Sequence, residues 1–342
     1  MCSVKHAAFP SIVSAAPVVV RTCGPAEPIH LVSVSGGKDS TATLLTALEL
    51  HGHGSVHAAF ADTGNEHEAT YDYVRYLEQA VGVPITWLRR DFTDMWWPRR
   101  DYVRDKWPEK GVPAHVVARA LAVFDKGPTG NPFLDLCIIK ARFPSRMAQF
   151  CTQFLKTQPL TEHALGLVEQ TGRAVVSWQG IRLDESESRR KRFAGTGACV
   201  KSYEVLGGGL SIHRPILRWT AADVFEAHRV KGVAPNPLYL QGRTRVGCLC
   251  INSSKQEVRQ WDLRDHAHIE RLHEWEEVVS LVSKRANATF FASPGDNDTA
   301  RERGGIWQVV EWAKTTRGGK QYDLLGSIDE GLTCSSAFGL CE

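Results

Sequence analysis

The segment Ser35-Gly36-Gly37-Lys38-Asp39-Ser40 combines residue types that bind phosphate. Its glycines let backbone amides approach an anion, and its serine hydroxyls can donate hydrogen bonds to phosphate oxygens. Lys38 supplies a positive charge for the negative charge that develops on phosphate, so we expect Lys38 and Asp39 to act in catalysis. The GxxxxGK[ST] spacing of a Walker loop is absent. A tight turn with a helix cap is the alternative interpretation.

The residues on either side of this loop predict the elements that hold it. Residues 31–35 form a short β-branched run, and leucines recur at helical spacing over residues 40–50. A helix that begins at the loop directs its partial positive charge at a bound phosphate. The loop therefore lies at the strand-to-helix position that phosphate binding requires.

The alternation of strand and helix continues along the chain. Further strands are predicted at residues 56–60, 85–88 and 174–178, and further helices at residues 67–81, 161–169 and 221–230. Thr220 is the expected N-cap of the last of these helices, with Asp223 in capping-box position. The pattern predicts an α/β fold, in which helices cover both faces of a Rossmann-like parallel sheet. Residues 180–189 are expected to form a loop.

Changes in this pattern indicate the domain organisation. We expect an N-terminal extension over residues 1–27, a nucleotide-binding domain over residues 28–242, and a small C-terminal subdomain over residues 243–342. The C-terminal subdomain bears cysteines and is mainly helical, with one helix at residues 269–285. Residues 91–132 are rich in tryptophan, proline and arginine and break the alternation, which predicts an insertion over the sheet edge. This insertion could be a lid.

Further motifs follow the loop in order along residues 28–342. They are Asp62-Thr63-Gly64-Asn65-Glu66, Phe150-Cys151-Thr152 with Lys156 and Pro159, Gly180-Ile181-Arg182-Leu183-Asp184-Glu185-Ser186, Asn236-Pro237-Leu238-Tyr239, and Arg245-Val246-Gly247-Cys248. The ordered set resembles the phosphoadenylyl-sulfate (PAPS) reductase-like family of the adenine-nucleotide alpha-hydrolase (PP-loop ATP pyrophosphatase) superfamily. The resemblance implies that the loop binds ATP or a sulfonucleotide, and that Asp62, Thr63 and Gly64 lie beside the adenosine.

Two further segments carry positive charge that could reach the nucleotide. Arg182 follows Gly180 after a predicted strand, and its guanidinium could fork onto phosphate or sulfate oxygens, with Glu185 orienting it. We therefore assign Gly180 and Arg182 to the nucleotide site, and Arg182 also to catalysis. A surface salt-bridge cluster is the alternative for Arg182. Lys156 is either a second phosphate contact or a solvated helix residue.

The cysteines suggest a metal site. Nine cysteines are an odd number for a disulfide framework, and a reducing cytosol favours metal ligation. The resemblance implies that Cys151 lies near the Cys248 region and that thiolates there bind a 4Fe-4S cluster, with zinc as the fallback. The candidate ligands are Cys151, Cys248, Cys250, Cys334 and Cys341. One family ligand is replaced by Thr152, so Cys334 and Cys341 would complete the set. Buried apolar thiols are the alternative.

The resemblance implies two mechanisms. In the first, ATP with Mg2+ is cleaved to AMP and pyrophosphate, an acceptor is adenylated, and sulfur displaces AMP. In the second, a cysteine near the C-terminus reduces PAPS or adenylyl sulfate (APS). Dedicated reductases usually carry a degenerate loop and a terminal Glu-Cys-Gly-Leu/Ile-His motif, whereas this chain keeps the full loop and ends Gly339-Leu340-Cys341-Glu342. We therefore favour sulfur transfer similar to that of the iron-sulfur enzyme of DNA phosphorothioation.

The partners follow from these alternatives. Sulfur transfer implies a sulfur-donor protein such as a cysteine desulfurase, and a homo-oligomer is compatible with the sequence. A third hypothesis is a non-catalytic nucleotide- or nucleic-acid-binding accessory, in which the insertion follows a nucleic-acid backbone while its aromatic rings stack on bases. The residues concerned are Trp96, Trp97, Arg99, Arg100, Arg104, Lys106 and Trp107. A packed lid with a solvated rim is the alternative.

Bulk properties add little to the choice of partner. The net charge of +3 is too small to indicate a nucleic-acid-binding protein. The apolar stretch at residues 12–20 is interrupted by Pro17 and is much shorter than a membrane span. We expect a cytoplasmic protein without a membrane partner.

Overall fold

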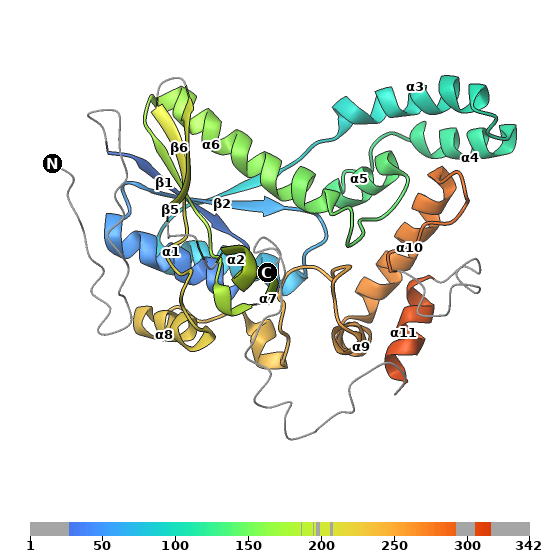
Figure 1. Cartoon of the computed structure of the whole chain (residues 1–342). Coiled ribbons are helices and arrows are strands. Elements are labelled where there is room, and N and C mark those ends of the chain that lie inside the picture. Colours follow the sequence, from blue (N-terminus) through green and yellow to red (C-terminus); the bar gives the residue numbers. More distant parts are fainter. Residues whose placement is uncertain are drawn as a thin grey trace.

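A six-stranded sheet forms the centre of the computed structural model, which describes residues 27–185, 187–193, 195, 199–205, 208–291 and 305–315 (Figure 1). The strands are β1 (Ile29–Val34), β2 (Val56–Asp62), β3 (Ile85–Arg89), β4 (Val175–Trp178), β5 (Cys199–Val205) and β6 (Gly208–His213). Their order is β3-β2-β1-β4-β6-β5, and all pairs are parallel except β5 with β6. The predicted α/β fold with a parallel sheet is confirmed.

Helices cover both faces of this sheet. The covering helices are α1 (Lys38–His51), α2 (Glu68–Val81) and α6 (Gln158–Thr171), and α8 (Ala221–Lys231) packs on α1. Val32 and Val34 of β1 belong to the apolar cluster that includes α1 and α2, whereas Ile29 and Leu31 belong to the cluster that includes α6. Because side chains alternate along a strand, β1 is apolar on both faces and lies in the core.

Two expectations for the second half of the sheet were incomplete. The β5–β6 hairpin was not predicted, because polar residues interrupt both strands and β6 begins with two glycines, which weakens the strand pattern. Residues 180–189 were expected to form a loop, but they contain the 3-10 turn Leu183–Glu185 and the start of α7 (Glu187–Phe193). The capping box of Thr220 with Asp223 at the start of α8 is confirmed.

The strand order places a functional crevice at the end of β1. The chain continues from β1 to β2 on one side, while β4 pairs with β1 on the other side. In a parallel sheet, the loops that follow two such strands diverge, and ligands bind in the crevice between them. The segment after β1 is the predicted phosphate loop, and the segment after β4 begins with Gln179 and Gly180.

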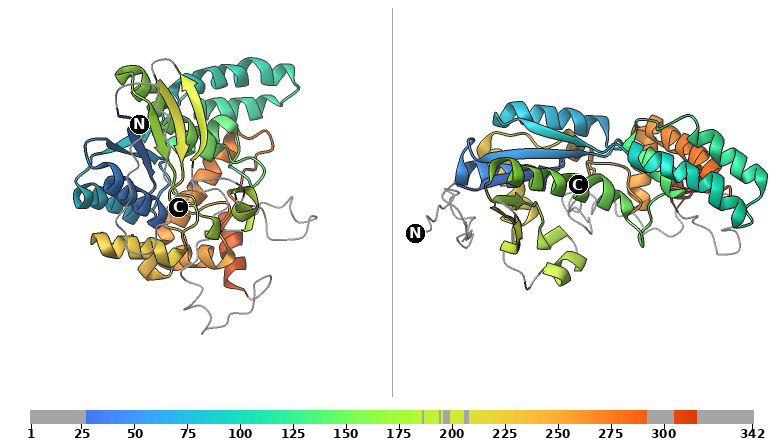
Figure 2. Two further views of the ribbon diagram at one scale, coloured as in Figure 1. Left: turned by 60° about the vertical axis from the view of Figure 1, so that its left-hand side comes forward. Right: turned by 90° about the horizontal axis from the view of Figure 1, so that it is seen from above.

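A second group of helices lies beside the sheet (Figures 1 and 2). It contains α3 (Thr93–Glu109), α4 (Ala114–Phe124), α5 (Pro132–Lys140), α9 (Lys255–Arg264), α10 (His266–Val282) and α11 (Ile306–Lys314). Residues 92–155 and 249–313 contribute to one apolar cluster, so the predicted insertion shares a core with the C-terminal helices. The predicted domain boundaries stay a prediction. None of the helices in the described ranges is long and apolar enough to cross a membrane.

Trp96 and Trp97 provide a matched test of the core around α3. Trp96 is fully buried and donates a hydrogen bond from Nε1 to the carbonyl oxygen of Phe124 at 2.9 Å, whereas Trp97 is 43% exposed. Trp96→Ala leaves a cavity, so we expect a loss of about 3–5 kcal/mol in the free energy of unfolding. Trp97→Ala should cost less than about 1 kcal/mol. Urea unfolding checks both, and equal losses would contradict this packing.

Candidate functional site

The phosphate loop joins β1 to α1 in a conformation that its glycines permit. Gly36 has a φ of +76°, and a Cβ at this position would lie 2.7 Å from Cγ2 of Thr70. The Ser40 hydroxyl closes the loop, because it donates to the Gly37 carbonyl at 2.9 Å and accepts from the Ser35 amide at 3.1 Å. A larger residue at Gly36 would therefore be disfavoured both by its backbone conformation and by contact with Thr70.

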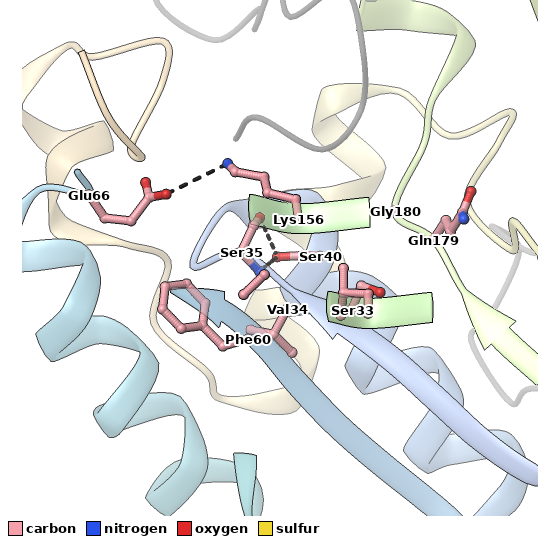
Figure 3. Close-up of a pocket in the computed structure, with 11 residues that line it drawn as sticks. Ser33, Val34, Ser35, Ser40, Phe60, Glu66, Lys156, Gln179 and Gly180 are labelled. Atoms are coloured by element: carbon pink, nitrogen blue, oxygen red, sulfur yellow. Dashed lines mark hydrogen bonds and ion pairs between the residues drawn. The ribbon is translucent and has the colours of Figure 1, made fainter. Parts of the chain in front are cut away.

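A pocket opens at this loop, on the crevice between β1 and β4 (Figure 3). Residues from four separate segments line it: Ser33, Val34, Ser35, Ser40, Phe60, Ala61, Glu66, Lys156, Leu160, Gln179 and Gly180. Four of the predicted nucleotide-site residues, Ser35, Ser40, Lys156 and Gly180, are thus brought together. Glu66 and Gln179 also line the pocket, although neither was assigned to the site from the sequence.

Lys156 and Glu66 form a charged pair at this pocket. Their Nζ and Oε1 atoms lie 3.6 Å apart, and Figure 3 shows the two side chains directed toward each other near Ser35 and Ser40. Lys156 lies on a π-helical turn, Thr152–Thr157, a rare geometry that often occurs at functional sites. The alternative of a solvated helix residue is not supported for Lys156, which is 9% exposed.

Asp39 holds two cations in the buried layer beneath the loop. Its carboxylate accepts from Arg182 Nε at 2.6 Å and pairs with Lys38 Nζ at 3.2 Å. All three side chains are at most 1% exposed. The alternative of a surface salt-bridge cluster is therefore wrong for Arg182, because its side chain is buried. A charge this deeply buried needs a close partner, and Asp39 supplies one. None of the three lines the pocket.

The segment after β4 packs closely against the start of α1. A Cβ on Gly180 would lie 2.9 Å from the carbonyl carbon and oxygen of Asp39, so only glycine fits without a backbone shift. Glu185 lies in this segment, accepts a hydrogen bond from the Arg182 amide at 3.3 Å and pairs with buried Arg189. Glu185 therefore fixes the backbone of Arg182, as the sequence suggested in part.

The second motif forms a tight loop after β2. The Asp62 carboxylate accepts from the Gly64 amide at 2.8 Å and from Arg89 at 2.5 Å, while the Thr63 hydroxyl donates to Glu66 Oε1 at 2.9 Å. Gly64 has a φ of +75°, which favours glycine. None of Asp62, Thr63 and Gly64 lines the pocket, so their placement beside adenosine stays a prediction.

The phosphate loop is held by hydrogen bonds between its backbone and the Asn236-Pro237-Leu238-Tyr239 motif. The Asn236 side-chain amide donates to the Gly36 carbonyl at 3.1 Å, and the Lys38 amide donates to Tyr239 Oη at 3.0 Å. The ammonium of Lys38 also lies 5.3 Å from the Tyr239 ring centre, within cation–π distance. Sequence reasoning recognised this motif but did not assign it a role.

A known protein family shares the segments that form this pocket. The model of the phosphoadenosine phosphosulfate reductase domain matches residues 29–109 and 137–281, which include every segment that lines the pocket. The chain belongs to this PAPS reductase family. The unmatched residues between the two ranges, 110–136, include all of α4.

Relatives of this PAPS reductase-family chain occur in bacteriophages. An uncharacterized 37.8 kDa protein in the gpa 5' region of Escherichia phage 186 is 40% identical over 338 residues, covering 92% of this chain and 97% of the relative. The nin region protein ORF290 of Escherichia phage lambda is 32% identical over 160 residues, 46% of this chain and 49% of that protein. A crystal structure of PAPS reductase from Candida auris, in a phosphate complex, has a TM-score of 0.38 and 17% identity, covering 66% of this chain and 83% of that one.

Among the described residues of this family member, cysteines interact in two pairs, Cys248 with Cys250 and Cys137 with Cys151. Cys248 and Cys250 are joined by a hydrogen bond that raises the pKa of Cys248 and lowers the pKa of Cys250. Cys151 interacts with Cys137, a core residue as predicted, and burial raises the Cys137 pKa. Within the described ranges, no three His, Cys, Asp or Glu side chains are placed to hold a metal ion. Cys334 and Cys341 lie outside those ranges, so the five-cysteine metal set stays a prediction.

The basic residues of the insertion are largely paired with carboxylates. Arg100 pairs with Asp125 at 2.6 Å, Arg104 pairs with Asp105 at 2.7 Å, and Lys106 pairs with Glu109 at 3.0 Å. Trp96 and Trp107 are buried and cannot stack on bases without unfolding. These contacts favour the alternative of a packed segment with a solvated rim over a nucleic-acid-binding surface, and nucleic-acid binding stays a prediction.

His67 connects the second motif to the C-terminal helices. Its Nδ1 accepts from the Ala69 amide at 3.0 Å and caps α2, so its Nε2 carries the proton that it donates to Asp265 at 2.8 Å. Burial, helped by the nearby Arg243, lowers the pKa of His67 to about 4. A second proton would remove the cap, so the folded protein favours neutral His67.

This lowered pKa predicts a pH-dependent stability. Unfolded His67 binds a proton below pH 6.5 and folded His67 does not, so the free energy of unfolding should fall as the pH falls from 6.5 toward 4. At pH 5 the contribution of this one group is about 2 kcal/mol. His67→Asn keeps a capping side chain without a titrating group and should reduce the loss between pH 7 and pH 5 by that amount. Urea unfolding at both values measures it.

The control is His273→Asn, on the exposed side of α10, where the side chain is 43% exposed. This variant should keep the pH dependence of the wild type. An unchanged pH dependence in His67→Asn would contradict the assignment of a neutral, buried His67.

Proposed function

We propose that this protein binds ATP at the phosphate loop and cleaves it to AMP and pyrophosphate, so that an acceptor is adenylated for sulfur transfer. The observation that carries the proposal is the complete loop, whose Ser35 and Ser40 line a pocket shared with Lys156 and Gly180. Backbone amides at the start of α1, together with these side chains, supply the donors that a chain of phosphates needs.

The charges around the pocket support a polyphosphate ligand. Lys156 lies at the pocket, and Lys38 and Arg182 lie in the buried layer beneath the loop with Asp39 as their shared partner. The positive end of α1 adds to these three cations, and together they favour a nucleotide with several negative charges. These groups would stabilise the charge that develops on pyrophosphate as it leaves.

Glu66 fits a magnesium ion between protein and nucleotide. Its Oε2 atom is buried without a hydrogen-bond partner, while its Oε1 faces Lys156 and Thr63. Mg2+ commonly binds one or two carboxylates together with substrate phosphates. When bound, the ion would offset the negative charges of the phosphates, and Glu66 would hold it at the pocket.

The described cysteines alone do not fit a four-thiolate cluster. The thiols of Cys248 and Cys250 share a hydrogen bond, and a complete set would need thiols such as Cys334 and Cys341, outside the described residues. We therefore derive no step from an iron-sulfur cluster. The cytoplasmic location, a nucleic-acid acceptor and a cysteine desulfurase as sulfur donor remain parts of the proposal.

Reduction of a sulfonucleotide is the second candidate, because the matching family model is that of a PAPS reductase domain. The same pocket would then hold the phosphosulfate group. Titration calorimetry with ATP and with adenylyl sulfate distinguishes the two candidates. Tighter binding of ATP with Mg2+ supports the first, and binding of adenylyl sulfate alone supports the second.

Lys38→Met tests the cleavage step. Lys38 is the cation within the loop itself, so its removal should lower pyrophosphate release from ATP and Mg2+ by about 100-fold or more. The assay includes double-stranded DNA and transfer RNA as acceptors and glutathione persulfide as sulfur donor. Circular dichroism shows whether the variant folds, and ATP binding shows whether the pocket persists.

Lys191→Met is the matched control, because the Lys191 side chain is 76% exposed on α7. It should release pyrophosphate like the wild type. A folded Lys38→Met protein with wild-type release, or a wild-type protein that releases no pyrophosphate under any of these conditions, would refute ATP cleavage by this loop.

A further inference from the structure

Cys248 and Cys250 form a thiol pair in a well-anchored segment. Their sulfur atoms are within hydrogen-bond distance of each other, and both residues are partly exposed and unoxidised. Leu249, the residue between them, is fully buried in the core shared by α3, α4 and α10. The segment is therefore fixed, and both cysteine residues are half-buried.

This pair lies beside the charged groups of the nucleotide pocket. Cys248 interacts electrostatically with Glu66 and Lys156, and Cys250 interacts with Lys156 and Arg245. Glu66 and Lys156 are the two pocket residues that face each other in Figure 3. A sulfur on either cysteine is thus close to the site where a nucleotide would be held.

Backbone contacts distinguish the two sulfurs. The Asn252 amide donates a hydrogen bond to Cys250 Sγ at 3.5 Å, and the Cys250 amide donates to the Ser253 hydroxyl at 3.1 Å. These contacts form a turn that holds Cys250 in place.

We propose that Cys250 carries the sulfur that this protein transfers, and that Cys248 releases it by closing a disulfide with Cys250. This inference rests on the proposed sulfur transfer and adds the residues that perform it. It assigns to the pair a role in covalent sulfur chemistry, as opposed to ligation of a cluster.

Loading needs a persulfide donor. Cys250 Sγ attacks the terminal sulfur of the donor, the sulfur–sulfur bond of the donor breaks, and the donor leaves as a thiol that takes the Cys250 proton. The product is a persulfide on Cys250. No net oxidation occurs in this exchange.

Transfer and release follow at the adenylated acceptor. The terminal sulfur attacks the acceptor atom that bears the AMP oxygen, and AMP leaves with that oxygen and the bonding electrons. Cys248 then attacks Cys250 Sγ, breaking its bond to the transferred sulfur, which leaves on the acceptor as a thiol. The cysteine pair is oxidised by two electrons and the transferred sulfur is reduced by two. A dithiol reductant restores the pair by exchange.

The spacing suits this cycle. A disulfide that closes over a single intervening residue is strained, and strained or exposed disulfides are the ones that thiols reduce readily. Such a pair would form its disulfide only transiently and return to the dithiol state in a reducing cytosol.

The reaction can be tested without ATP or an acceptor. If the anaerobically purified protein is treated with glutathione persulfide, Cys248 should displace hydrosulfide from the persulfide on Cys250. Peptide mass spectrometry should then show a Cys248–Cys250 disulfide in the wild type. Cys248→Ser should retain one extra sulfur atom on Cys250 and release hydrosulfide at least about 10-fold more slowly, since the resolving thiol is absent.

Cys199→Ser, at the start of β5, is the matched control and should behave like the wild type. Three results would overturn the proposal: no sulfur on Cys250 in Cys248→Ser, loading on Cys248 in Cys250→Ser at the wild-type rate, or about four irons with sulfide per chain that are lost when either cysteine is replaced. Since no nucleotide takes part, failure here is distinct from failure of ATP cleavage.

Discussion

The buried carboxylate of Asp39 is the constraint on which the site depends. It holds Lys38 from its own helix and Arg182 from the segment after β4, so one side chain joins the two sides of the crevice. Removing three charges from water is costly, and only close pairing offsets that cost. Loss of Asp39 would leave two buried cations without this shared carboxylate, which links the integrity of the fold to the same residue that shapes the phosphate loop.

The surrounding contacts make the loop rigid before any ligand binds. His228 of α8 reaches the Lys38 carbonyl at 3.0 Å, and Asn236 and Tyr239 hold the backbone on either side. Gly180 allows the β4 segment to approach Asp39 without a clash. These contacts hold the hydrogen-bond donors of the loop in a fixed geometry. Binding a phosphate would therefore require little reorganisation of the loop.

Features of this region that depend on neighbouring residues in the sequence are predicted well. Contacts between residues far apart in the sequence are predicted less well. The strand, loop and helix at the phosphate loop follow from adjacent residues, and so does the capping box at Thr220. The burial of Arg182 and the approach of Lys156 to Glu66 depend on residues about ninety to 140 positions apart, and no pattern of spacing encodes those distances. The β5–β6 hairpin was missed because pairing with β4, more than strand propensity, stabilises it.

The second motif connects the nucleotide pocket to the remainder of the molecule. Within it, Glu66 lines the pocket and interacts with Cys248, while its neighbour His67 binds Asp265 between α9 and α10. The Thr70 hydroxyl, one turn later, donates to the Val246 carbonyl just before the cysteine pair. A ligand that changes the charge around Glu66 would therefore act on the cysteine pair through a short electrostatic path, because the same loop contacts both. One continuous set of contacts therefore joins the nucleotide motif to the cysteine segment.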